Sequence, residues 1–122
     1  MTLRRFLLAL VLAAIALPAF GQTFTPQSPS GLTLTFTTER AGGTRLLVLG
    51  DVRNTSNTPA QRITLLAEGL DQDGRVVSRA RGYVSGSIPS HGSTSFEIRL
   101  LTSGSERRYR VQVESFEFQV SN

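Results

Sequence analysis

Residues 61–84 read QRITLLAEGLDQDGRVVSRARGYV, and this stretch decides the fold. Apolar and polar residues alternate on both sides of Asp73-Gly74, a dipeptide that favours tight hairpin turns. A period of two is typical of strands and differs from the 3.6-residue period of a helix. The stretch therefore predicts two antiparallel β-strands joined by a hairpin.

A two-residue loop at Asp73-Gly74 predicts which residues lie opposite each other in this hairpin. Apolar residues then face apolar residues and an acid faces a base, as favourable cross-strand pairs require. The expected pairs are Leu70–Val77, Glu68–Arg79, Ala67–Ala80 and Ile63–Val84. A slip of two residues would preserve both faces, so the alternation fixes the faces more firmly than the register.

The same alternation continues on both sides of the hairpin, and helical periodicity is absent. Clusters of Gly, Pro, Asn and Ser separate the alternating segments and predict turns. Besides the hairpin strands, which begin at Gln61, we expect strands over Leu32–Glu39, Arg45–Arg53, Phe96–Leu100 and Tyr109–Val120. Six or seven short strands in this arrangement predict an all-β fold, a small antiparallel β-sandwich.

The last expected strand changes its phase partway along. Its first half places Tyr109, Val111 and Val113 on one face, whereas Phe116 and Phe118 follow the opposite phase. This half-step predicts a β-bulge near Glu114-Ser115 or a strand that passes from one sheet to the other.

The segment Val48–Leu100 resembles the bacterial FxLYD-type domain, and it covers about half of the chain that follows residue 21. The matching features, in order, are Gly50-Asp51-Val52-Arg53-Asn54, Pro59-Ala60 with Ile63 and Leu65, Leu70-Asp71-Gln72-Asp73-Gly74-Arg75-Val76-Val77, and Ile88-Pro89 with Gly92 ahead of Phe96. The name-giving Phe-x-Leu-Tyr-Asp motif aligns with Ala67-Glu68-Gly69-Leu70-Asp71, where small residues replace two large ones. The resemblance implies an immunoglobulin-like β-sandwich and a location in the cell envelope, and it brings no catalytic residues.

The first 21 residues have the layout of a secretory signal peptide. Arg4-Arg5 supplies the basic start, Phe6–Leu17 is uninterrupted and apolar, and Ala19-Phe20-Gly21 places small residues at −3 and −1 of a cut after Gly21. The apolar run is shorter than the roughly 20 residues of a spanning helix, which favours a cleaved signal over a retained anchor. We expect an exported protein, periplasmic or secreted, without a stable membrane span after cleavage. Its polar leader comprises residues 22–30 and its β-sandwich domain residues 31–122.

Composition excludes several classes of chemistry. The chain has no cysteine and no lysine, so thiol nucleophiles, thiolate metal ligands, lipidation of an N-terminal cysteine and lysine Schiff bases are excluded. Removal of residues 1–21 takes two of the 13 basic residues, all arginine, and leaves a net charge of +2. The basic residues are not clustered with aromatic residues, so we expect no nucleic-acid partner.

The candidate catalytic and metal-binding groups are isolated from one another. Asp71-Gln72-Asp73-Gly74 resembles the start of a calcium loop, but the later ligands of such a loop are missing and a hairpin turn explains it better. His91 is the only histidine and lies beside Ser90, which leaves a Ser–His–Asp arrangement formally open. Glu106, Glu114 and Glu117 are expected on the surface. We therefore predict no enzyme, no catalytic or metal site and no cofactor.

One face of the hairpin has a composition that indicates a binding role. Arginine and tyrosine beside exposed aliphatic residues are the composition that protein interfaces favour. The residues predicted for this interaction face are Arg62, Leu66, Leu70, Val77, Arg79, Arg81 and Tyr83. The competing interpretation is an ordinary outer sheet face on which arginine stems lie flat.

Two functional hypotheses follow. The first is a non-enzymatic interaction or structural module that contacts another envelope protein through a sheet face or an edge strand; edge pairing is also compatible with a homodimer. The alternative is a binding module for anionic envelope ligands such as polysaccharide, lipid headgroups or polyphosphate. Its basis is the set of surface arginines, including Arg107, Arg108 and Arg110.

Overall fold

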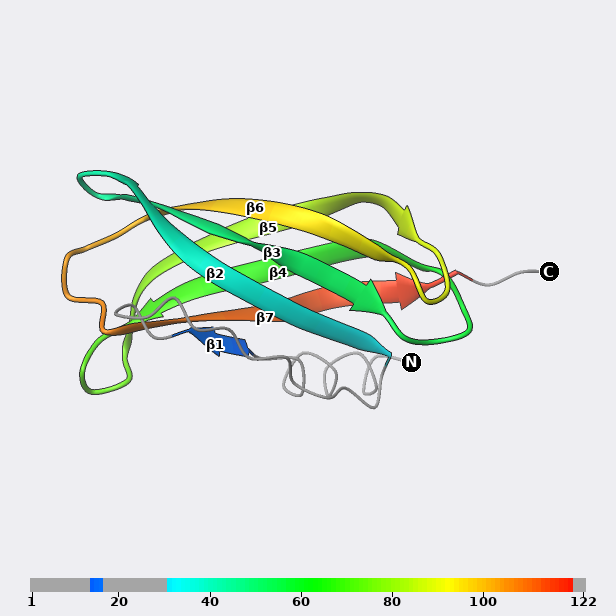
Figure 1. The fold of residues 1–122 in the computed structure, drawn as a ribbon. Helices are drawn as coiled ribbons and strands as arrows, with labels where there is room; N and C mark the ends of the chain where they lie inside the picture. The colour runs from blue at the N-terminus through cyan, green and yellow to red at the C-terminus, as the bar shows by residue number, and fades with distance from the viewer. Residues whose placement is uncertain (1–13, 17–30, 120–122) are drawn as a thin grey trace.

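The computed structural model describes residues 14–16 and 31–119, and within these ranges the chain forms strands and no helix. Two antiparallel sheets face each other across a core (Figure 1), one with the order β1-β7-β4-β5 and the other with the order β2-β3-β6. The strands are β1 (Ala14–Ala16), β2 (Leu32–Gly42), β3 (Arg45–Asn54), β4 (Ala60–Leu70), β5 (Val76–Ile88), β6 (Ser93–Leu101) and β7 (Arg108–Phe118). The predicted all-β sandwich is confirmed.

The core lies between the two sheets and comes from the inward phase of every strand in the domain. The two strands of the central hairpin bury Ile63, Leu65 and Val84, as their alternation predicts. The remaining side chains of the core include Leu32, Leu34, Phe36, Val48, Val52, Ile88, Phe96, Ile98, Leu100, Tyr109, Val111, Val113 and Phe116. Because the chain has no cysteine, this apolar packing holds the sheets together without a disulfide.

The hairpin loop is longer than the sequence predicts. The inner pairs Glu68–Arg79, Ala67–Ala80 and Ile63–Val84 are confirmed, but Leu70 lies opposite Val76, so the expected Leu70–Val77 pair is wrong. The carboxylate of Asp71 is the cause, since its Oδ1 accepts the N–H groups of Asp73 and Arg75, each at 2.9 Å. These bonds close a loop over 71–75 and leave one extra residue in β5, which forms a bulge.

The phase change in the last strand is a β-bulge, one of the two alternatives that the sequence predicts. Leu65 of β4 lies opposite Val113, and the preceding Thr64 lies opposite Ser115, so Glu114 is the extra residue of β7. The bulge turns Phe116 inward, where its ring meets the ring of Phe118 edge-on at 5.0 Å. One strand therefore buries both apolar groups without leaving its sheet.

Gly69 marks the position where the chain departs most from the FxLYD motif. A Cβ at Gly69 would meet Cγ of Glu106 at 2.5 Å and Cε1 of Tyr109 at 3.3 Å. The Ser78 hydroxyl of β5 lies closer still, so side chains of β5, the β6–β7 loop and β7 together occupy the space that a large residue at Gly69 would need.

β1 comes from the segment that the sequence assigns to a signal peptide. Its three residues pair antiparallel with β7, with Ala14 opposite Val111 and Ala16 opposite Tyr109. The rest of the expected signal peptide and the leader at 22–30 lie outside the described residues, as do residues 120–122. Described residues contain no helix long and apolar enough to cross a membrane.

Asn54 is fully buried at one end of the sandwich, and its side chain forms hydrogen bonds that join three segments of the chain. Its Nδ2 donates to the carbonyl oxygens of Thr58 at 2.8 Å and Ile88 at 3.0 Å. Its Oδ1 accepts the backbone N–H of Ser56 at 3.0 Å and the Ser56 hydroxyl at 2.7 Å. A single amide thus joins the end of β3, the β3–β4 loop and the end of β5.

We expect Asn54→Ala to lower the free energy of unfolding by about 2–3 kcal/mol, because it leaves the buried Ile88 carbonyl without its donor. Urea denaturation at neutral pH measures this change. Asn57→Ala, in the same loop but exposed, is the matched control and should change stability by less than about 0.5 kcal/mol. Equal effects of the two substitutions would contradict the role of Asn54.

Candidate functional site

The outer face is the side of the β7-β4-β5 sheet that points away from β2-β3-β6. Central strand β4 has a neighbouring strand on each side, so each of its outward residues lies between two cross-strand residues. Leu66, for example, lies opposite Arg81 of β5 and Gln112 of β7. Leu66 and Leu70 are buried, with exposures of 7% and 3%. These two members of the predicted interaction face are therefore covered.

Glu68 is the most unusual residue of this face, because it is a carboxylate with only 3% exposure. Arg79 lies opposite it on β5 and Arg110 lies opposite it on β7. Nη2 of Arg79 lies 3.2 Å from Oε2 of Glu68, and Nε of Arg110 donates to Oε1 at 3.0 Å. Two guanidinium groups thus compensate the desolvation of one carboxylate.

A second ion pair crosses the same face one step further along the sheet. Arg81 of β5 donates from Nε and Nη2 to the two carboxylate oxygens of Glu114 on β7, at 2.7 and 2.9 Å. The pair reaches across β4, in which Leu66 lies opposite Arg81. The hydrogen bond from Arg81, and then its charge, hold the pKa of Glu114 below its ordinary value although partial burial opposes this shift.

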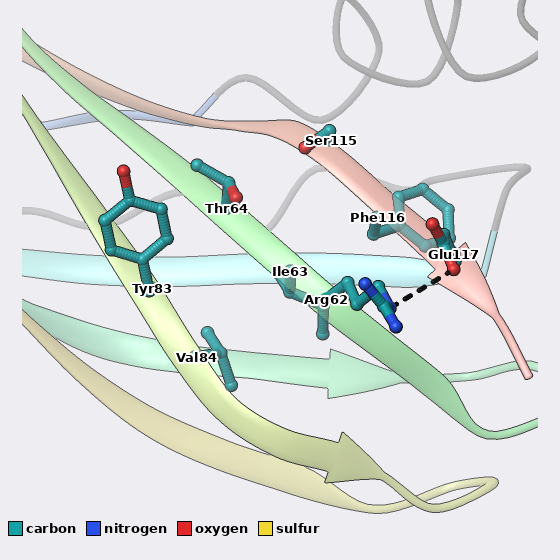
Figure 2. Close-up of a pocket in the computed structure, with 8 residues that line it drawn as sticks. All are labelled: Arg62, Ile63, Thr64, Tyr83, Val84, Ser115, Phe116 and Glu117. Carbon is teal, nitrogen blue, oxygen red and sulfur yellow. Dashed lines mark ion pairs between the residues drawn. The ribbon is translucent and has the colours of Figure 1, made fainter.

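An open hollow of about 360 Å³ lies at the end of the outer face, where β4 and β7 are both irregular. Figure 2 shows Tyr83 of β5, Thr64 of β4 and Ser115 of β7 across its width, and Arg62 beside Glu117 at one end. Nε of Arg62 lies 3.7 Å from Oε1 of Glu117. Tyr83 is 74% exposed, so this hollow presents the largest accessible aromatic surface of the face.

Arg62 has a strained backbone. Its φ is +55°, in the left-handed region, and the register shifts at this point toward both β5 and β7. A non-glycine residue in this region costs roughly 1–2 kcal/mol, and such strain is concentrated at functional sites. These register shifts form a bulge in which Arg62 has no cross-strand partner on β5, and its side chain is 77% exposed.

The structure divides the predicted interaction face into a covered part and an accessible part. Val77 is half-buried at the bulge beside the hairpin loop, while Arg79 and Arg81 are exposed but engaged in ion pairs. Arg62, whose Nε lies 3.7 Å from Oε1 of Glu117, and Tyr83 are the largely exposed side chains around the hollow. The sequence predicts the Glu68–Arg79 pair and places Glu114 and Glu117 on the surface, but it does not connect Glu114 or Glu117 with this face, because the alternation of β7 does not reveal which strand lies beside it.

The remaining candidate residues are used in local structure. His91 lies in a turn with a φ of +62°, and its Nε2 is 3.0 Å from Oδ1 of Asn57. The Ser90 hydroxyl donates to the carbonyl oxygen of Ser56 at 2.7 Å rather than to His91. Residues 14–16 and 31–119 contain no group of three or more His, Cys, Asp or Glu side chains that could hold a metal ion.

A second hollow, of about 600 Å³, lies on the opposite sheet over β3 and β6. Leu47 and the 70% exposed Leu101 supply apolar surface there. Glu97 and Arg99 of β6 border it and pair with each other at 3.4 Å. This surface was not predicted from the sequence, although the outward leucines of β3 are its signal.

Comparisons with known proteins show a likeness of fold. No protein-family model and no curated protein matches the chain. Among solved structures, the trimeric lipoprotein SadB of Salmonella enterica has a TM-score of 0.60 over 97% of this chain and 67% of SadB, at 10% identity. Envelope protein VP37 of White Spot Syndrome Virus has a TM-score of 0.57 over 86% of this chain and 90% of VP37, also at 10% identity.

These likenesses place the chain in the class of small β-sandwich domains. They agree with the two-sheet architecture of the described residues. The finer assignment to the FxLYD type has no matching family model and stays a prediction.

The pKa of Glu114 implies a defined pH dependence of stability. Because folding lowers this pKa from 4.5, the ion pair stabilises the fold above that pH, and the contribution is lost as the pH falls through the folded-state value. Glu106 acts in the same direction: burial opposes the shift, but hydrogen bonds from the N–H groups of Ser103 and Gly104 lower its pKa. Stability should therefore decline on the acid side.

We expect Glu114→Gln to reduce the loss of stability between pH 7 and pH 3, because glutamine cannot titrate. Urea denaturation of both proteins at the two pH values measures the difference. Glu97→Gln, on the other sheet, is the matched control and should leave the loss as it is in the parent protein. An unchanged acid loss in Glu114→Gln would show that the Arg81–Glu114 pair contributes nothing to folding.

Proposed function

We propose that this protein is an exported, non-enzymatic β-sandwich module that binds another envelope protein through the hollow at the end of its outer face. The observation that carries the proposal is that Arg62 and Tyr83 border the same hollow. Both side chains are largely exposed, and they flank one hollow. Tyrosine and arginine dominate the binding energy of protein interfaces.

The local backbone supports a binding role for Arg62. If β4 paired in a regular register here, Arg62 would not need its left-handed conformation. Instead, β4 has a bulge at this position relative to both β5 and β7. Since the exposed side chain gains little from packing, we assign the strain to the placement of the guanidinium beside the hollow.

Export and the envelope location rest on the sequence and on the kind of proteins that share the fold. The first 21 residues have a signal-peptide layout. SadB is described as a trimeric lipoprotein and VP37 as an envelope protein, which makes an extracytoplasmic or envelope role the natural proposal for this chain.

An anionic ligand is the second candidate, and a group of arginines at one end of the sandwich favours it. Arg107 donates its N–H to the carbonyl oxygen of Leu70, which brings the β6–β7 loop against the hairpin loop that carries Arg75. Arg108 approaches the same loop at Gly74. None of these three guanidinium groups forms an ion pair with a described residue, whereas Asp71 and Asp73 offset part of their charge.

The test is an affinity capture from envelope extract, with the full chain exported by a bacterial host and carrying a C-terminal tag. We expect a discrete protein to be retained at both low and high salt, since a desolvated Tyr–Arg contact resists screening. The double variant Arg62→Gly, Tyr83→Ala should reduce retention by about tenfold or more. Mass spectrometry of the retained material measures both results.

The variants are chosen to leave the fold intact. Glycine accepts the positive φ of Arg62, so Arg62→Gly should keep or raise the melting temperature. Arg62→Gly removes only the long, exposed contact with Glu117, whereas substitutions at Arg79 or Arg81 would break the shorter ion pairs with Glu68 and Glu114. Arg99→Ala with Leu101→Ala, on the other sheet, is the matched control. Equal retention by both double variants would contradict the proposed site, and salt-sensitive release of glycan, lipid or polyphosphate would favour the second candidate.

A further inference from the structure

The outer edge of β7 is the least protected part of the sheet. On one side β7 pairs with β4 over most of its length, and on the other side it pairs with the three residues of β1, opposite residues 109–111. β1 lies inside the expected signal peptide. A cut after Gly21, on which the proposed function also rests, therefore removes this partner and makes β7 an edge strand.

An open edge at this position would be costly. Loss of β1 uncovers the backbone N–H and C=O groups of residues 109–111, beside the buried side chains Tyr109 and Val111, and extends the edge of residues 112–118 that no described strand covers. The polar leader at 22–30 is poorly suited to replace β1, because Pro26 and Pro29 lack the N–H groups that a ladder requires. A strand from another molecule would satisfy the unpaired backbone groups of this edge.

We propose that β7 of a second copy of this chain pairs antiparallel with this edge, on a two-fold axis at Gln112. Residues 110–114 read RVQVE, a pattern that is complementary to itself when reversed. Gln112 faces Gln112, Val111 faces Val113, and Arg110 faces Glu114 of the second copy. An axis of this kind uses the same patch on both subunits, and each of these cross-strand pairs is favourable.

The ion pairs on the outer face continue across this axis. Within one chain, Glu114 is bound by Arg81, and Arg110 is bound to Glu68. In the dimer, Glu114 meets Arg110 of the second copy, so that arginine and glutamate alternate from one sheet into the other without like charges in contact. The bulge at Glu114 ends the regular part of the ladder and confines the pairing to the segment around residues 110–114.

The edge of β6 provides a comparison within the same molecule. Residues 96–100 read FEIRL, which is also complementary to itself when reversed. However, β6 pairs only with β3 among the described strands, whereas a strand already adds to the outer edge of β7. The observed pairing with β1 therefore selects β7 over β6.

The absence of cysteine makes disulfide trapping a direct test. The full chain carrying Gln112→Cys is exported by a bacterial host, and the mass of the exported product shows whether the cut falls after Gly21. Two facing cysteines on paired strands meet the Cα separation of roughly 4.4–6.8 Å that a disulfide needs. We expect a covalent dimer on a non-reducing gel, and a dimer of the parent protein by sedimentation.

Arg99→Cys on β6 is the matched control and should remain monomeric on the same gel. A parent protein that sediments as a monomer, a chain that keeps residues 1–21, or equal cross-linking at positions 112 and 99 would each overturn the proposal. If Gln112→Cys does not fold, sedimentation of the parent protein decides alone. A monomer that still retains a protein partner would overturn the dimer and leave the proposed function standing, whereas a dimer without a partner would do the reverse.

Discussion

The burial of β4 on both of its faces is the constraint on which this structure depends. One face contributes Ile63 and Leu65 to the core, and the other buries Leu66 and Leu70 although no second layer of the described domain covers them. The strands on either side place long arginine side chains on this face, Arg79 and Arg81 of β5 and Arg110 of β7, and their guanidinium groups reach Glu68 and Glu114. The ion pairs of the outer face therefore lie on a sheet whose central strand is buried on both of its faces.

The fold was largely predictable from the sequence, because alternation reports which side of each strand is buried. The inward residues of β6 followed from periodicity alone, and periodicity predicted the phase change in β7 while leaving a bulge and a change of sheet as alternatives. The register next to the hairpin loop did not, since it depends on hydrogen bonds from the Asp71 side chain. Because the Asp71 side chain accepts two backbone N–H groups, the partner of Leu70 shifts by one residue. A hydrogen bond of this kind cannot be predicted from the alternation of apolar and polar residues.

The candidate site was predicted only in part, and for a related physical reason. Arg62 and Tyr83 were recognised from their outward phase, but their grouping around one hollow depends on the bulges of β4 and on the position of β7 beside it. Leu66 and Leu70 were assigned to an exposed face, whereas both are buried in the structure. Burial on an outward face is a property of three adjacent strands, and a sequence pattern read one strand at a time cannot report it.

The basic partners in the ion pairs of the outer face are all arginine, and this affects how the face responds to alkaline pH and to amine-directed reagents. A guanidinium group does not lose its proton in proteins under conditions in which a lysine would begin to do so. The bonds that join β5 to Glu68 and Glu114 therefore keep the positive charge of their arginines in strongly alkaline solution. Amine-directed reagents also find no lysine to modify, so the cover over β4 is chemically inert to acylation.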